Sequence, residues 1–161
     1  MDSVSLRYSN VFGPRQRSDG EGGVVAIFID KILEGKRPAI FGAGLQTRDF
    51  LYVDDAVDAA VSAIKASSGT RAQRRVKKRF ISSTAIYNVG TNKEINIKEL
   101  LVLISLEMNQ KVKPKFLPLR QGEILKSRVD YSKIKKDLGW QPKYSLEDGL
   151  KKTIKWFKIK K

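Results

Sequence analysis

The chain contains no cysteine and no histidine among its 161 residues. Without cysteine it can form neither a disulfide framework nor a thiolate site, and this absence leads us to expect a cytoplasmic protein. Without histidine it lacks the commonest general base and the commonest metal ligand. Any acid–base chemistry would therefore use carboxylates, tyrosine or lysine, and the sequence predicts no metal site.

Long apolar stretches are also missing. The longest unbroken apolar run covers residues 24–29, far below the roughly 20 residues that a helix needs to cross a bilayer. The first residues carry neither a basic start nor a long apolar segment, so we expect no signal peptide and no membrane partner. Apolar residues make up 41% of the chain, which at this length indicates one globular domain with its own core.

Acidic residues are few relative to basic ones. The 32 lysines and arginines oppose 17 acids, which gives a formal net charge of +15. Residues 65–79 hold basic residues without a single acid or aromatic residue, so nothing there can stack on a base. We predict a solvated basic loop insertion at residues 67–83 and a lysine-rich helix face at the end of the chain. Binding to a nucleic acid or an acidic polymer stays open as an alternative function.

Short apolar runs and turn residues predict alternating strands and helices. We expect strands at residues 4–8, 39–41, 49–53 and 85–89, and extended chain at 111–118. We expect helices at residues 24–33, 54–65, 96–108 and 132–138, and a last helix from residue 145 onward. The spacing of apolar residues in the second helix predicts a buried face made of Val57, Ala60, Val61 and Ile64.

A basic residue stands directly before the strand predicted at residues 49–53. The Arg48 guanidinium, held rigidly there, can bind a phosphate through two parallel hydrogen bonds. Alternatively, Arg48 is a surface residue that pairs with Asp49. The spacing alone leaves both interpretations open.

Three ordered stretches carry a resemblance to a known family. Residues 41–55, FGAGLQTRDFLYVDD, resemble the pattern FGxGxxxRDFxYVxD, and residues 7–16, RYSNVFGPRQ, resemble RYxNVxGPRQ. Residues 119–142 contain LRQGE, DYSK and LGWQP, which resemble RxGD, DxSK and LGWxP. These patterns are typical of the nucleotide-sugar epimerases and dehydratases of the extended short-chain dehydrogenase/reductase family. The resemblance covers nearly the whole chain, and the residues of these motifs are most similar to those of the UDP-glucose 4-epimerases.

The resemblance implies an α/β fold in which an N-terminal portion binds NAD and a C-terminal portion binds the nucleotide sugar. Residues 1–161 would form the C-terminal nucleotide-sugar-binding portion, with a partial Rossmann-type parallel sheet edge and the smaller C-terminal substrate-binding α/β domain. The family's glycine-rich phosphate turn and its Tyr-x-x-x-Lys pair would precede Leu6, so the N-terminal NAD-binding portion is expected to be absent. Tyr131 and Lys135 have this spacing but lie inside the DYSK motif, and we interpret them as a coincidence. No catalytic residue is expected in the chain.

By resemblance, five residues would bind the substrate: Asn10, Phe41, Arg48, Arg120 and Glu123. Asn10 would touch the sugar or a phosphate, and Phe41 would pack on the nucleotide base, although a core phenylalanine in a strand is the alternative. Arg48 and Arg120 would clamp the diphosphate. Glu123 stands where the family usually has aspartate and would hold a ribose hydroxyl.

Two further residues, Tyr8 and Ser9, would lie on the nicotinamide side of NAD, the cofactor of the complete family enzymes. We do not expect NAD to bind this chain alone. The implied function is the UDP-hexose-binding part of an NAD-dependent sugar 4-epimerase that is inactive by itself. Alternatives are a portion of a 4,6-dehydratase or decarboxylase, or a non-catalytic sugar-nucleotide-binding subunit. The expected partners are a UDP-sugar and either the missing N-terminal half or a second copy.

Overall fold

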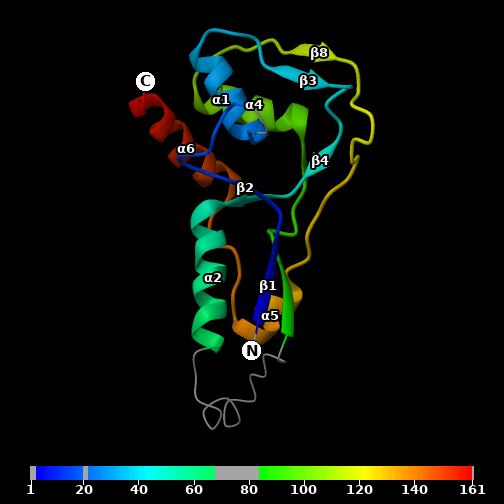
Figure 1. The fold of residues 1–161 in the computed structure, drawn as a ribbon. Coiled ribbons are helices and arrows are strands. Elements are labelled where there is room, and N and C mark those ends of the chain that lie inside the picture. Colours follow the sequence, from blue (N-terminus) through cyan, green and yellow to red (C-terminus); the bar gives the residue numbers. More distant parts are fainter. Residues whose placement is uncertain (1–2, 20–21, 68–83, 161) are drawn as a thin grey trace.

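The structure is a computed structural model that describes residues 3–19, 22–67 and 84–160. Most of the insertion predicted at residues 67–83 lies outside these ranges. Figure 1 labels the described elements, which follow the chain in this order: β1 (Ser3–Tyr8), β2 (Asn10–Phe12), α1 (Val24–Leu33), β3 (Ala39–Phe41), β4 (Thr47–Arg48), β5 (Phe50–Tyr52), α2 (Val53–Ser67), β6 (Thr84–Val89), β7 (Ile95–Asn96), α4 (Ile97–Glu107), β8 (Lys115–Leu117), α5 (Ser132–Leu138) and α6 (Leu146–Lys160).

Helix boundaries follow the capping residues of the sequence. At the start of α4 the Asn96 side chain accepts a hydrogen bond from the Glu99 N–H at 2.8 Å. Before α6 the Ser145 hydroxyl accepts one from the Asp148 N–H at 3.0 Å. Each cap satisfies an N–H that the first turn of a helix leaves without a partner. The helices predicted at residues 24–33 and 132–138 are confirmed with the same bounds.

The strands form four pairs rather than one broad sheet. Strand β1 pairs with β6, β2 with β5 and β3 with β8, all in parallel, while β4 and β7 pair antiparallel. Strands β1 and β6 form a two-stranded parallel sheet in which Leu6 lies opposite Tyr87. The strand predicted at residues 49–53 is present as β5, and Asp49 lies at the junction between β4 and β5, where the chain changes its pairing partner.

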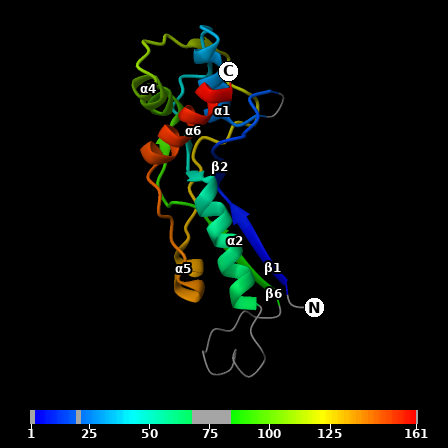
Figure 2. The same ribbon diagram turned by 90° about the vertical axis from the view of Figure 1, so that its left-hand side faces the viewer.

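The elements gather at two ends of an elongated molecule (Figures 1 and 2). At one end, which we call the helical lobe, α1, α4 and α6 pack together with β3 around Phe28, Ile40, Leu100, Ile104 and Leu150. At the other end, which we call the strand lobe, α2 and α5 pack on the β1–β6 pair around a smaller group that includes Tyr87, Ile134 and Trp140. Burial of each large apolar side chain contributes about 1.5–3 kcal/mol. The β2–β5 pair lies between the two lobes.

The predicted buried face of α2 is wrong. Val57 and Ile64 are 57% and 64% exposed, and Val61 is 37% exposed. The structure instead buries the opposite face, whose small residues are Ala56, Ala59 and Ala63. Small side chains let the helix backbone approach β1 and α5 closely, and this face also carries Asp55, which is 1% exposed. The Asp55 carboxylate accepts the N–H groups of residues 143 and 144 at 2.9 and 3.1 Å, so hydrogen bonding as well as packing determines the orientation of α2.

Candidate functional site

Two loops lie side by side at the edge of the helical lobe. We call them the paired loops, residues 41–48 and 117–125. The Gly42 N–H donates to the Leu117 carbonyl at 2.8 Å, which extends the pairing of β3 with β8 into the loops. Gly42 and Gly44 have φ angles of 62° and 74°, a conformation that favours glycine. The turn glycines of the FGAG motif therefore shape a tight turn that the second loop can contact.

An aromatic ring and a cation meet on the paired loops. The guanidinium carbon of Arg120 lies 3.8 Å from the centre of the Phe41 ring. This distance is that of a cation–π contact. Phe41 lies at the end of β3 and is only half-buried there. The structure thus brings together the residue predicted to pack on a base and one of the two arginines predicted to bind a diphosphate.

The second predicted arginine is held by three acceptors. Arg48 forms an ion pair with Glu123, and the two side chains are only 17% and 14% exposed. Its Nη1 also donates to the carbonyls of Thr47 and Ile124, at 2.8 and 2.6 Å. The alternative interpretation, in which Arg48 pairs with Asp49, is therefore wrong. A guanidinium fixed in this way is preorganised to present its remaining donors to an anion.

Asn10 connects the paired loops to the end of β1. Its backbone N–H and its side-chain Nδ2 both donate to the carbonyl of Asp49, at 3.0 and 3.1 Å. Asp49 directly follows Arg48 in the chain. The exposed Asn10 carboxamide and the Arg48 guanidinium are therefore attached to one run of backbone.

The two residues predicted on the cofactor side lie at the end of β1. The Tyr8 hydroxyl donates to the Ala56 carbonyl of α2 at 3.3 Å, and burial raises the pKa of Tyr8 above its usual value of 10.0. The Ser9 hydroxyl is buried and has no hydrogen-bond partner among the described residues. A buried hydroxyl without a partner is uncommon in a folded protein, so this position has hydrogen-bonding capacity left for a ligand.

The described residues do not supply a site for the pyrophosphate of NAD. Such a site needs a glycine turn that opens onto a free helix N-terminus. Only α1 is preceded by glycines in the described chain, and a Cβ at Gly23 would overlap the carboxamide of Gln16, which occupies that helix end. The FGAG turn leads into β4 rather than into a helix.

Asp49 is the residue of this site that the sequence reasoning missed. It is 0% exposed although it carries a charge. A usable signal is its position directly before the apolar strand Phe50–Tyr52, since an acid next to a strand that is buried on both faces needs its own hydrogen-bond donors.

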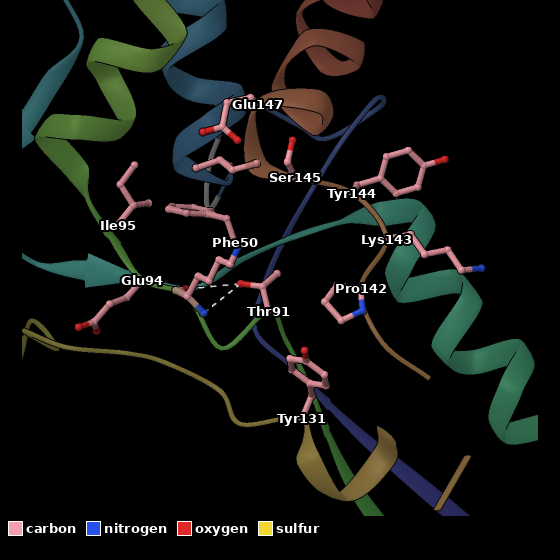
Figure 3. A pocket seen from close by; sticks show the side chains of 12 residues that line it. Phe50, Thr91, Glu94, Ile95, Tyr131, Pro142, Lys143, Tyr144, Ser145 and Glu147 are labelled. Carbon is pink, nitrogen blue, oxygen red and sulfur yellow. Dashed lines mark hydrogen bonds between the residues drawn. The ribbon is translucent and has the colours of Figure 1, made fainter. Parts of the chain in front are cut away.

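A cavity of about 500 Å³ lies between the start of α6 and the turn after β6 (Figure 3). Phe50, Tyr131 and Pro142 form apolar walls, and Thr91 and Glu147 add polar groups. None of the seven predicted site residues lines this cavity. The hydroxyl of Thr91, a residue that lines this cavity, donates a hydrogen bond to the Asp49 carboxylate, and the Asp49 carbonyl accepts one from Asn10.

Two other kinds of site have no support in the residues that the structure describes. Within residues 3–19, 22–67 and 84–160 there is no cluster of three or more acidic side chains arranged to hold a metal ion. The helices of the same ranges are all too short or too polar to cross a membrane. The cytoplasmic location stays a prediction.

Comparison with known proteins identifies the family. The family model described as GDP-mannose 4,6-dehydratase matches residues 1–153. The chain belongs to the nucleotide-sugar epimerase/dehydratase family. Its curated relatives include the UDP-glucose 4-epimerase of Mycolicibacterium smegmatis, which is 39% identical over 160 residues, 99% of this chain and 47% of the relative. Other family members that resemble it are named as decarboxylases or as a 4,6-dehydratase.

Solved structures of family members share the mixed α/β fold. The UDP-glucose 4-epimerase of Thermotoga maritima, solved with UDP-glucose, has a TM-score of 0.84 and 39% identity, over 98% of this chain and 46% of the other. The UDP-N-acetylglucosamine 4-epimerase of Methanobrevibacter ruminantium, solved with UDP-N-acetylmuramic acid, has a TM-score of 0.86 and 31% identity, over 100% of this chain and 47% of the other. Structures of other members contain NAD. The chain spans about half the length of the relatives it matches.

Proposed function

We propose that this chain is the nucleotide-sugar-binding portion of an NAD-dependent sugar 4-epimerase and that it binds a UDP-hexose. In this proposal residues 1–161 correspond to the C-terminal portion of the family's chains, with the substrate-binding α/β domain in the helical lobe and the Rossmann-type sheet edge in the strand lobe. The observation that carries the proposal is the contact of Arg120 with the Phe41 ring beside the Arg48–Glu123 ion pair. Relatives named as UDP-glucose 4-epimerases support the choice of substrate class.

Each group of the site has a matching part of a nucleotide diphosphate. The Phe41 ring offers an apolar face for the base. The Arg120 and Arg48 guanidinium groups offer paired N–H donors, which suit phosphate oxygens. When a phosphate takes a donor of Arg48, Glu123 loses part of its ion pair and becomes an acceptor for a ribose hydroxyl. The Asn10 carboxamide, exposed at the start of β2, offers a donor and an acceptor to the sugar or phosphate.

We further propose that the chain has no epimerase activity by itself. The hydride chemistry that NAD supplies in this family requires a pyrophosphate turn and a general base. The described residues offer no open helix end after a glycine turn, as shown by Gln16 at the start of α1. Tyr8 and Ser9 would meet the nicotinamide side of a cofactor held mainly by another portion of the enzyme or another chain. A UDP-sugar and such a second portion, or a second copy, are the proposed partners.

A second candidate within the family is a portion of an NDP-sugar 4,6-dehydratase or decarboxylase, or a non-catalytic subunit that binds the same ligands. The matching family model is described as a 4,6-dehydratase, and one relative, a decarboxylase of Danio rerio, is 36% identical over 151 residues. These functions share the diphosphate site and differ in base and sugar. Competition among UDP, dTDP and GDP for the same site separates the base preferences.

Calorimetric titration with UDP tests the proposed function. We expect saturable binding with a dissociation constant below about 1 mM, and at least tenfold weaker binding for Arg120→Gln, because one charged hydrogen bond to a phosphate is worth about that much. Arg128→Gln is the matched control, since Arg128 is an exposed arginine that follows the same loop but contacts neither Phe41 nor Glu123 in the described contacts. Absence of UDP binding, or equal loss in both variants, would refute the proposal.

A further inference from the structure

Asp49 carries a buried carboxylate that is bound by four donor groups. Its Oδ1 accepts the Thr91 N–H at 3.0 Å and the Thr91 hydroxyl at 2.7 Å. Its Oδ2 accepts the N–H groups of Asn92 and Val129, at 3.1 and 3.2 Å. A carboxylate offers about four acceptor positions, so these donors saturate it. The charge of Asp49 is thereby stabilised in a place with no access to solvent.

The packing around this carboxylate leaves no spare space. A Cβ at Gly90 would lie 2.8 Å from Asp49 Oδ2 and 2.7 Å from Val129 Cβ. Only glycine therefore lets the end of β6 approach so closely. Asp49 joins three parts of the chain at one point: the β4–β5 junction, the turn after β6 and the segment that leads to α5.

The backbone carbonyl of Asp49 holds a second group. It accepts both the N–H and the side-chain Nδ2 of Asn10, at 3.0 and 3.1 Å. The orientation of the Asn10 carboxamide is therefore set by the position of the Asp49 backbone. That position is in turn fixed by the four donors on the Asp49 carboxylate.

The segment that bears Arg120 and Glu123 depends on the same residue. Between β8 and α5 the chain has no helix or strand over residues 118–131. Backbone N–H groups attach it to the β3–β5 region at three points, from Gly42 to the carbonyl of residue 117 at its start, from Thr47 to the carbonyl of residue 125, and from residue 129 to the Asp49 carboxylate. The Arg48 side chain adds a hydrogen bond to the carbonyl of residue 124 and the ion pair with Glu123. An irregular segment loses much conformational entropy on ordering, so each attachment matters for its position.

We propose that Asp49 is the positioning residue of the nucleotide-sugar site. It does not touch the ligand, because it is fully buried. It acts through its carbonyl on Asn10, through the chain on Arg48, and through Val129 on the segment of Arg120 and Glu123. This inference rests on the proposed function for the identity of the ligand, but the arrangement of the site residues that it explains has its own readout.

The test compares Asp49→Asn with Asp55→Asn in the full 161-residue chain. Asparagine places an NH₂ group where Asp49 now accepts only N–H and O–H donors. Asp55 is the matched control because it is equally buried and also accepts two backbone N–H groups, but it holds α2 to residues 143 and 144, away from the site. We expect about tenfold weaker UDP binding for Asp49→Asn and less than a twofold change for Asp55→Asn. In NMR spectra the Asn10 side-chain amide and the Arg48 Nε–H signals should shift only in Asp49→Asn.

The outcomes distinguish the two proposals. If the parent chain does not bind UDP, the proposed function fails, and the NMR signals of Asn10 and Arg48 alone decide whether Asp49 positions them. Unchanged UDP affinity in Asp49→Asn, unshifted signals, or an equal loss in Asp55→Asn would overturn the positioning role. If Asp49→Asn does not fold, Thr91→Val replaces it, because it removes the 2.7 Å hydrogen bond to Asp49, together with the longer contacts of the hydroxyl with Lys93, while keeping the side-chain shape. We then expect about threefold weaker binding that Thr91→Ser restores, and a failure of Thr91→Ser to restore binding would count against the proposal.

Discussion

Arg48 and Glu123 form a largely enclosed ion pair although they lie 75 residues apart in the sequence. The pair joins β4 to the second of the paired loops, and two carbonyls share the same guanidinium. It therefore has a structural role in the free protein and a proposed ligand role in the complex. The two roles compete for the same donors.

Removing the charge of Glu123 should reduce stability. We expect Glu123→Gln to lower the free energy of unfolding by about 1–3 kcal/mol, because Arg48 loses a charged acceptor at a site that is mostly shielded from water. Urea denaturation followed by circular dichroism measures this change. Glu34→Gln is the control, since Glu34 pairs with Lys31 and Lys36 on the surface and its removal should leave the unfolding midpoint unchanged. Equal shifts in both variants would contradict the shielded character of the Arg48 pair.

The Phe41 ring should matter for binding more than for folding. In Phe41→Leu the apolar contact with Arg120 is kept in part but the aromatic face is lost, so we expect UDP to bind about three- to tenfold more weakly. Phe116→Leu is a matched control on the paired strand β8, where the ring is 54% exposed. Calorimetric titration of both variants with UDP measures the difference. A similar loss in Phe116→Leu would assign the effect to the β3–β8 pair instead of the ring.

The parts of the fold that the sequence predicts are those decided by neighbours along the chain. The helices predicted from residues 96 and 145 onward begin within one residue of those positions, and the cap of each joins two residues three positions apart. The helix predicted at residues 132–138 ends at its predicted residue because Gly139 follows it with a φ of 72°. Local hydrogen bonding therefore carries the successful predictions.

The parts that the sequence does not predict depend on distant partners. The donors that hold Asp49 come from residues 42 to 80 positions away, and nothing near Asp49 in the chain signals them. The face of α2 was predicted from the largest apolar residues, whereas the structure buries alanines such as Ala59 because a close backbone approach requires small side chains. The periodicity of apolar residues predicts an amphipathic helix, but it does not show whether large side chains or a close backbone approach decide which face is buried. The sequence likewise offers Asp49 as a partner for Arg48 because the two are neighbours, whereas the partner in the structure is the distant Glu123.

Gly149 provides a test in which packing opposes helix propensity. It lies in the interior of α6, where alanine is normally better than glycine by about 1 kcal/mol. A Cβ there would lie 2.6 Å from Phe12 Cζ and 2.9 Å from Tyr52 Cδ2. We therefore expect Gly149→Ala to destabilise the protein by about 1–3 kcal/mol, measured by thermal unfolding. Lys151→Ala, at an exposed position of the same helix, should leave the free energy of unfolding unchanged. A stabilised Gly149→Ala variant would contradict the expectation, because it would show that the Phe12 and Tyr52 rings move aside at little cost.

Alkaline pH should weaken the strand lobe through Tyr87. Burial raises the pKa of Tyr87 above its usual 10.0, and the negative charge of Asp137 and a hydrogen bond to it raise this pKa further. In the unfolded chain the phenol ionises near pH 10, so above this pH the unfolded state releases a proton that the folded state keeps. Stability contributed by Tyr87 is thus complete below pH 10 and is lost as the pH rises above it. Melting temperatures measured from pH 9 to 11 should fall less steeply in Tyr87→Phe, and equal slopes would contradict the expectation.

The exposed face of α2 should drive association of the isolated chain. Val57 and Val61 follow one another at helical spacing on this face, and in the described chain β1 and β6 pair only with each other, so their outer edges have no strand partner. An exposed apolar surface beside open strand edges favours contact with a further polypeptide. We expect concentration-dependent oligomers in sedimentation velocity up to about 100 µM. The double variant with Val57→Ser and Val61→Ser should be largely monomeric without a loss of unfolding free energy beyond about 0.5 kcal/mol, since both side chains are already exposed.

A matched pair on another helix shows whether the position of the apolar residues matters. Val102 and Leu106 on α4 have the same spacing and are 52% and 69% exposed, but α4 lies in the helical lobe, at the opposite end of the molecule from the β1–β6 pair (Figure 1). Replacing both with serine should leave the oligomers in place, because α4 adjoins no unpaired parallel strand. An equal effect of the two double variants would mean that exposed apolar area alone causes association. A parent chain that stays monomeric and melts cooperatively above about 60 °C would contradict the expected association through α2 and would favour an independent binding module.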